Sequence, residues 1–351
     1  MKDRVLTWIL LMATFVFSAC GGDDAVPNAV ESITIVKSDL IFEPVGRTGS
    51  VEVLAKGPVT VELQSDWCSA SVNGNVVSVT VADNNSFEGR TALMTLRADG
   101  AARRLPIQQR GMALGSLPVN SHHSPNSGER FALYIRHDLP VTLTCDDDWI
   151  HPEMIGDSLV ITIEKNPNLY LRRSVVGFEC AGYEDELTIT QYDFEYILGT
   201  YFMAGTGQGG VTQGFRFNFR KVDNDYFINF FTVDQWADRN VPVEFDEGLC
   251  EITFHSATNI YEKGTDRDII YFFQEDGTVA NTPGATMKAL IYYNPFQQTH
   301  YAALEDGGTW GGDPLVGLLI YTIRGGGMVQ TALAQLLDPY LLWLGSEENI
   351  R

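Results

Sequence analysis

The cysteines of this 351-residue chain are the side chains best suited to metal binding, disulfide formation or nucleophilic attack. The chain has no Cys-x-x-Cys pair, and no histidine stands at zinc-site spacing from Cys68, Cys145, Cys180 or Cys250. The spacing therefore predicts no structural metal, and nothing else in the chain calls for a cofactor. Cys20 is a separate case because it follows an apolar segment near the amino terminus.

The first 20 residues have the order of a secretory leader. Two basic residues precede an apolar run at residues 5–16, and the small residues Ser18 and Ala19 stand directly before Cys20. Because the run is too short to span a bilayer, we expect a signal peptide over residues 1–19 that is removed. The pattern resembles the lipobox of bacterial lipoproteins. This resemblance implies acylation of Cys20, with palmitate among the chains, and stable anchoring of the mature protein.

Residues 20–30 are then expected to form a lipidated tether. Within it, Gly21-Gly22-Asp23-Asp24 resembles the short acidic signal that directs Bacteroidota lipoproteins to the outer face of the outer membrane. The resemblance implies a lipid-anchored, surface-exposed protein of the outer membrane. A formal net charge of −21 argues against nucleic acid as a partner, because a strongly acidic surface repels phosphates.

Motifs of known enzyme classes are missing. The sequence contains neither GxSxG nor HExxH. Residues 205–210 spell GxGxxG, but a strand-like segment follows where a dinucleotide site needs a helix, so a hairpin loop is expected. We therefore predict a protein that is not an enzyme. Plentiful carboxylates leave a glycan hydrolase open as an alternative.

An internal repeat organises the first half of the chain. Residues 58–110 align with residues 140–192 without a gap. Each copy alternates apolar and polar residues with period two, and turn residues interrupt it at short intervals. The pattern predicts two immunoglobulin-like β-sandwich domains in tandem, at residues 31–112 and 113–193.

Five residue types recur at the same intervals in both copies. We expect structural roles for them, with the tryptophan filling a small core and the arginine capping loop carbonyls. In order they are Trp67, Asn84, Arg90, Gly100 and Gln109, and then Trp149, Asn166, Arg172, Gly182 and Gln191. These runs resemble BACON domains, modules of Bacteroidota surface proteins. The resemblance implies either a carbohydrate association or a spacer that holds a terminal domain away from the membrane.

The repeat also bears on two of the cysteines. Cys145 aligns with Leu63 and Cys180 aligns with Ala98, so both positions are expected to be buried. Since an exported protein can form disulfides, two states of these residues stay open: a Cys145–Cys180 bridge, or buried free thiols.

Residues 194–351 differ from the repeated segments in composition and pattern. Aromatic-rich strands are predicted at 215–220, 251–255, 269–273, 289–293 and 318–321, with Gly- and Asp-rich turns between them. Consecutive antiparallel strands favour a barrel-like domain, because closure removes exposed edges. The pattern is similar to calycin-like, lipocalin-shaped domains that follow BACON modules. Residues 328–337 predict a short C-terminal helix, ended by Asp338-Pro339.

The expected fold class is thus all-β, with two sandwiches followed by an antiparallel barrel and a short helix. The expected function is non-catalytic binding of a glycan or another small ligand by the C-terminal domain. Flat aromatic side chains are the groups that stack on sugars, and we name Trp236, Tyr261, Tyr293 and Trp310 as candidate contacts. The alternative is a structural or assembly subunit that docks to another outer-membrane protein.

Overall fold

The computed structural model describes residues 33–230, 240–327 and 329–346. In these ranges the regular elements are strands, apart from three 3-10 turns at Phe194–Tyr196, Gln208–Gly210 and Gly325–Gly327. The predicted all-β class is confirmed. None of the described elements is a helix long and apolar enough to cross a bilayer. The chain divides into two compact units, the first ending at Arg110 without residues 84–88, and the second made of residues 84–88 and 111–351.

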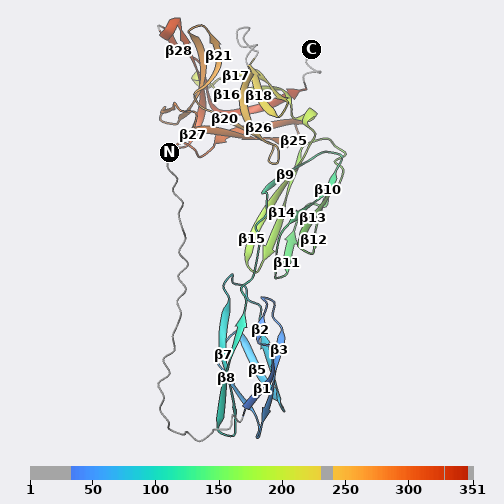
Figure 1. Ribbon diagram of the computed structural model, residues 1–351. Helices are drawn as coiled ribbons and strands as arrows, with labels where there is room; N and C mark the ends of the chain where they lie inside the picture. The colour runs from blue at the N-terminus through green and yellow to red at the C-terminus, as the bar shows by residue number, and fades with distance from the viewer. Residues whose placement is uncertain (1–32, 231–239, 328, 347–351) are drawn as a thin grey trace, which may run out of the picture. The chain divides into compact units, whose positions relative to one another are not determined.

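The first unit contains a sandwich of two four-stranded sheets, with strand orders β1-β3-β6-β5 and β2-β8-β7-β4 (Figure 1). Alternate residues of each strand point inward, so that Val77 and Val79 of one sheet share a core with Met94 and Leu96 of the other. The strands are β1 (Ile33–Ser38), β2 (Ile41–Phe42), β3 (Thr48–Ala55), β4 (Thr60–Leu63), β5 (Cys68–Asn73), β6 (Val76–Val81), β7 (Arg90–Ala98) and β8 (Ala101–Gln109).

A second sandwich begins the other unit, with sheets β10-β13-β12 and β11-β14-β15-β9. Its strands are β9 (Ser121–Ser124), β10 (Glu129–Tyr134), β11 (Val141–Thr144), β12 (Ile150–Ile155), β13 (Ser158–Ile163), β14 (Arg172–Cys180) and β15 (Tyr183–Gln191). The last four strands of each sandwich begin and end at positions related by the repeat. The gapless alignment therefore reflects one fold used twice.

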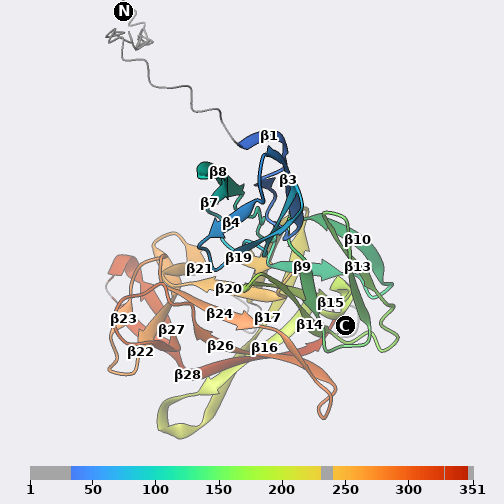
Figure 2. The ribbon, with the colours of Figure 1, turned by 90° about the horizontal axis from the view of Figure 1, so that it is seen from below.

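Eight strands of the C-terminal domain close into a barrel. Their order is β28-β16-β17-β18-β19-β20-β24-β26, and β26 pairs back onto β28. Figure 2 shows β20, β24 and β26 side by side. The barrel strands are β16 (Gly199–Thr206), β17 (Thr212–Val222), β18 (Asp225–Phe230), β19 (Asn240–Asp246), β20 (Glu251–His255), β24 (Thr286–Leu290), β26 (Thr299–Asp306) and β28 (Val329–Gly345).

The long strand β28 takes part both in the barrel and in an extension of its sheet. Its second half pairs with β16 and β26 in the barrel, whereas its first half pairs with β27. From β27 the sheet continues outward through β22 to β21 and β23, and the short strand β25 pairs with β26. These added strands are β21 (Thr258–Lys263), β22 (Asp266–Gln274), β23 (Val279–Ala280), β25 (Tyr292–Asn294) and β27 (Leu315–Arg324).

The predicted helix at residues 328–337 is wrong, because residues 329–337 form the first half of β28. Alanine, leucine and glutamine favour helices locally, but β27 offers a full ladder of backbone partners and tertiary pairing outweighs propensity. The side chains follow period two, with Leu336 buried and Leu337 exposed. At the predicted break, Asp338 takes a φ of +47° and the pairing with β16 is irregular, so the strand bulges there.

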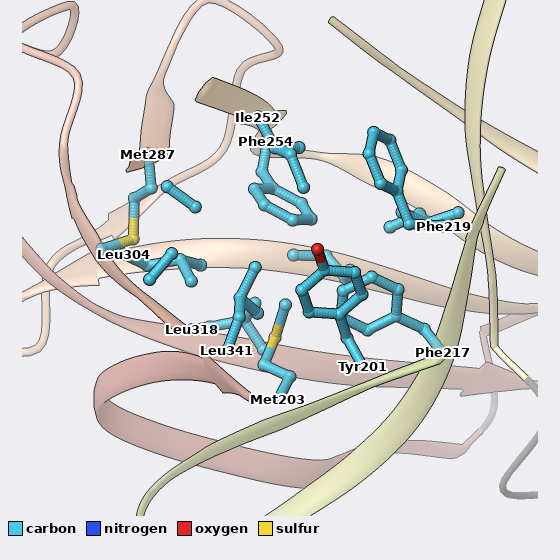
Figure 3. Close-up of a cluster of buried hydrophobic side chains, with 14 of the residues drawn as sticks. Tyr201, Met203, Phe217, Phe219, Ile252, Phe254, Met287, Leu304, Leu318 and Leu341 are labelled. Carbon is cyan, nitrogen blue, oxygen red and sulfur yellow. The ribbon is translucent and has the colours of Figure 1, made fainter. Parts of the chain in front are cut away.

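The barrel interior is a packed core. Figure 3 shows large side chains from several strands pointing toward one another across it. An eight-stranded barrel is just wide enough for side chains to fill, or for one small ligand. Here the inward positions carry bulky buried residues, so the search for a binding site moves to the outer surface. The labelled core residues are Tyr201, Met203, Phe217, Phe219, Ile252, Phe254, Met287, Leu304, Leu318 and Leu341.

Candidate ligand-binding site

A groove of about 290 Å³ runs over the outer face of β20, β24 and β26. It arises because residues that alternate with the buried core positions of these strands point outward. Its volume lies at the lower end of small-molecule sites. The lining residues are Glu251, Lys288, Leu290, Tyr292, Tyr301, Ala303, Glu305 and Asp306.

Two tyrosines supply the aromatic surface of this groove. Tyr292 of β25 and Tyr301 of β26 are direct partners in the antiparallel register, and their ring centroids are 6.0 Å apart with an interplanar angle of 33°. Tyr292 is 44% exposed and Tyr301 is 38% exposed. Both rings are therefore held by strand pairing while remaining open to solvent, as an aromatic platform for a sugar requires.

The groove has more carboxylates than ammonium groups. The Lys288 Nζ atom lies 2.7 Å from Glu251 Oε1, and this bond raises the pKa of the lysine. Glu305 is opposite Lys288 in the β24–β26 register but has no ion pair among the described residues. The Asp306 Oδ1 atom is enclosed and accepts no hydrogen bond from the described chain. With three carboxylates and one ammonium, the groove carries net negative charge.

Arg173 of the second sandwich lies behind the aromatic surface. Its guanidinium carbon is 5.0 Å from the centroid of the Tyr292 ring. The Nη2 group donates hydrogen bonds to the carbonyls of Leu249 and Ile291, which belong to the barrel domain. Burial lowers the pKa of Arg173. The guanidinium thus lies over the Tyr292 ring while backbone carbonyls of the barrel domain hold it in place.

Among the residues that the structure describes, the aromatic residues predicted as ligand contacts do not form one site. Trp236 lies outside the described residues. Tyr261 is half-buried on β21, where the guanidinium of Arg324 covers its ring at 5.4 Å. The Tyr293 ring stacks on Tyr170, with centroids 4.0 Å apart, and Trp310 packs against the barrel core. The rings of Tyr261 and Tyr293 are thus contacted by side chains of the protein itself.

The groove instead uses Tyr292 and Tyr301, which sequence reasoning missed. Adjacent strand residues point to opposite faces, so only one of the pair Tyr292 and Tyr293 can face the groove. The alternation in residues 289–293 indicates that the two tyrosines face opposite sides of the sheet, but it does not show which of them faces the groove. The register with β26 decides it, and in that register the partner of Tyr292 lies nine residues away in sequence.

The Cys145–Cys180 disulfide is the wrong one of the two predicted states, because both cysteines are free in the structure. In the β11–β14 register Val141 lies opposite Cys180, so Cys145 stands four residues farther along the strand. At about 3.3 Å per residue, the two Cα atoms are well beyond the ~7 Å limit for a disulfide. The Cys180 thiol is buried, which raises its pKa. Cys20, the predicted lipidation site, lies outside the described residues.

The repeated residues of the sandwiches have the structural roles that the sequence predicts. In the first copy the guanidinium of Arg90 lies 4.5 Å from the centroid of the Trp67 ring and donates to the Gln109 side chain and to the carbonyls of Ala82 and Asp83. The arginine thereby closes the end of the sandwich. The tryptophan face that could have met a sugar is occupied by a side chain of the same domain.

The second copy repeats this arrangement. The Arg172 guanidinium lies 4.0 Å from the Trp149 ring centroid, its Nε donates to Gln191 at 2.7 Å, and its Nη2 donates to the Glu164 carbonyl at 2.9 Å. Burial lowers the pKa of Arg172. Gln191 is fully buried, so its amide depends on these internal partners.

Replacing Arg172 with alanine should therefore destabilise the second unit by about 2 kcal/mol. The change removes the stacking on Trp149 and leaves the buried Gln191 oxygen without its donor. Urea unfolding of the mature chain measures the loss. The matched control is Arg130→Ala, whose exposed ion pair with Glu153 is worth little. Equal stability of the two variants would contradict the structural role.

Comparison with protein-family models places two matches on the sandwiches. Residues 46–110 and 140–192 match the BACON family, described as "Putative binding domain, N-terminal". These two segments are therefore similar to BACON domains, as the repeated residues predict. None of the curated proteins compared matches the chain.

Solved structures with a similar arrangement include three of different kinds. The I9–I11 tandem of titin is 11% identical, covers 86% of this chain and 97% of its own, and has a TM-score of 0.32. A Bacteroides ovatus GH5 xyloglucanase in complex with a XXXG heptasaccharide is 21% identical over 28% of this chain and 22% of its own, with a TM-score of 0.22. An endo-fucoidan hydrolase of glycoside hydrolase family 107 is 7% identical over 48% of this chain and 29% of its own, with a TM-score of 0.27. The chain spans less than a third of the length of either hydrolase.

Proposed function

We propose that this chain is a non-catalytic, lipid-anchored protein of the bacterial outer membrane whose C-terminal domain binds a glycan at the cell surface. The observation that carries the proposal is the groove on β24 and β26. Its paired tyrosine rings offer apolar faces to sugar C–H groups, and the exposed carboxylate of Glu305 can accept hydrogen bonds from sugar hydroxyls. The matched BACON domains support a carbohydrate-associated role.

The charge of the groove narrows the class of glycan. Three carboxylates face it, and its only lysine is already paired with Glu251. A sulfated or uronic sugar would bring further negative charge to an acidic surface. We therefore expect neutral or amine-bearing sugars to bind in preference to acidic ones.

Replacing Tyr301 with alanine should weaken glycan binding at least tenfold, about 1.4 kcal/mol, because it removes half of the aromatic platform at the centre of the site. Isothermal titration of the mature chain with tetramers of glucosamine, N-acetylglucosamine, glucose and glucuronic acid measures the effect. The control is Tyr134→Ala, an exposed tyrosine on β10 that is 67% exposed and far from the groove in sequence. Failure of every tetramer to bind, or equal loss in both variants, would count against the groove as the site.

The membrane anchor has its own test. Mass spectrometry of the mature amino terminus should find an acylated Cys20, and added protease should degrade the protein on intact cells. An unmodified terminus would remove the anchor from the proposal. A protease-resistant protein on intact cells would instead point to a periplasmic orientation.

A further inference from the structure

The two sandwiches differ in the surface residues near their equivalent arginines, Arg90 and Arg172. Several positions of the second copy contact the C-terminal domain, and four of them carry a residue of a different type from the repeat partner. In the first copy these positions are all exposed and hold, in order, Glu88, Gly89, Thr91 and Arg110. In the second copy they hold Tyr170, Leu171, Arg173 and Tyr192.

The replaced residues reach into the barrel domain by different kinds of contact. Leu171 is buried as a member of the barrel's own hydrophobic core, and its backbone N–H donates to His300 Nε2 at 3.4 Å. Tyr192 is also buried in that core, and its hydroxyl donates to the Glu247 carbonyl at 2.9 Å. Arg173 bonds two barrel carbonyls and lies against Tyr292.

This junction differs in kind from a linker between independent domains. It combines buried apolar packing, charge-assisted hydrogen bonds and a stacked aromatic pair, Tyr170 with Tyr293. Residues 111–351 accordingly form one compact unit, whereas most of the first sandwich forms another. Contacts of this kind make two domains unfold together.

We propose that the second sandwich is an integral part of the binding unit, and that its Arg173 is a positioning residue for Tyr292 in the groove. The first sandwich keeps the role of an interchangeable spacer. The positioning role rests on the proposed glycan site, while the coupling of the two domains does not.

Hydrogen exchange of the full mature chain tests the coupling. Ile107 and Ile189 are repeat partners, and each is fully buried in its own sandwich core. Ile189→Ala should accelerate exchange of the slowest amides of β26 by the same factor as those of β14, at least tenfold. Ile107→Ala should leave the amide exchange rates of β26 unchanged. If Ile189→Ala does not fold, Ile189→Val removes less of the core side chain and should give a smaller acceleration of the same kind. Unchanged β26 exchange in both Ile189 variants would overturn the proposal.

Arg173→Thr, which installs the residue of the first copy, tests the junction itself. In this background the effect of Ile189→Val on β26 should fall at least threefold, because the strongest polar link is gone. An undiminished effect would mean that Arg173 does not carry the coupling.

The positioning role is measured by affinity in the folded protein. Arg173→Thr should weaken binding of the glucosamine tetramer at least fivefold at a temperature where the variant remains folded. Ile189→Val lowers stability through the same unit but should leave the affinity unchanged. Equal affinities of Arg173→Thr and wild type would refute positioning. If the tetramer fails to bind the wild-type chain, the glycan site fails, and the exchange experiment still decides the coupling.

Discussion

Replacing Asp268 with alanine should lower the free energy of unfolding of the second unit by about 3 kcal/mol. Asp268 is fully buried on β22, 2.8 Å from Arg324 Nη1, and it accepts a 2.7 Å hydrogen bond from the Thr322 hydroxyl on β27. Removing one partner of a buried ion pair leaves the other charge uncompensated, which typically costs ~3–5 kcal/mol. We expect the lower end because the Arg324 side chain is 25% exposed and water can solvate it in part.

Urea unfolding of the mature chain at neutral pH measures this effect. The bond to Asp268 raises the pKa of Arg324 in the wild type. Arginine also keeps its charge at neutral pH without such a bond, so Arg324 stays charged in the variant. Asp225→Ala removes an exposed carboxylate of the same C-terminal domain and should change stability by less than about 0.5 kcal/mol. The double variant Asp268→Ala with Arg324→Ala should recover part of the loss, since no charge is then stranded. A loss below 1 kcal/mol in the single variant would show that the pair does not hold β22 to β27.

The two sandwiches could be predicted closely because the information is local. Period-two alternation identifies β6 and β13, and the repeat supplies an independent check on their ends. The carbonyl-capping role of Arg90 and Arg172 was also accessible, because each arginine opens the strand that follows a loop. Barrel closure followed from a general argument about exposed edges, without knowledge of which strands meet.

What could not be predicted depends on contacts between distant segments. Residues 329–337 favour a helix by composition, and only the ladder to β27 makes them a strand. The failed disulfide has the same cause, since the β11–β14 register separates Cys145 from Cys180 although both positions look buried. The groove required the β25–β26 register to show that Tyr292, rather than Tyr293, faces outward.

The domain junction was hidden for a related reason. Aligning the repeats draws attention to positions that agree, and the contacts to the barrel lie at positions that differ, such as Arg173 and Tyr192. In a repeated domain, a change from an exposed polar residue to a large or buried one signals a neighbour that the other copy lacks. Exposed Arg110 and buried Tyr192 occupy equivalent positions and illustrate this signal.

Acidification should weaken the second unit through His300 at the same junction. Burial lowers the pKa of His300 from 6.5 to about 4. Its Nε2 accepts the Leu171 N–H, its Nδ1 has no partner in the described chain, and its ring meets Tyr293 and Trp343 edge to face. Within the described part of the chain no carboxylate pairs with the ring to stabilise an imidazolium, and a proton on Nε2 would displace the Leu171 donor.

The sign follows from linkage between protonation and folding. Between pH 6.5 and about 4 the unfolded chain binds a proton at His300 and the folded chain does not, so stability falls as the pH falls through this window. The full loss is about 3 kcal/mol, reached below pH 4. His300→Phe keeps an aromatic ring at the site and cannot titrate, so its stability should decline less between pH 7 and pH 4.5 than that of the wild type. His151→Ala removes an exposed histidine and should follow the wild-type profile. Urea midpoints across this range decide the matter: parallel profiles for wild type and His300→Phe would mean that the histidine is not the group that makes the junction sensitive to acid.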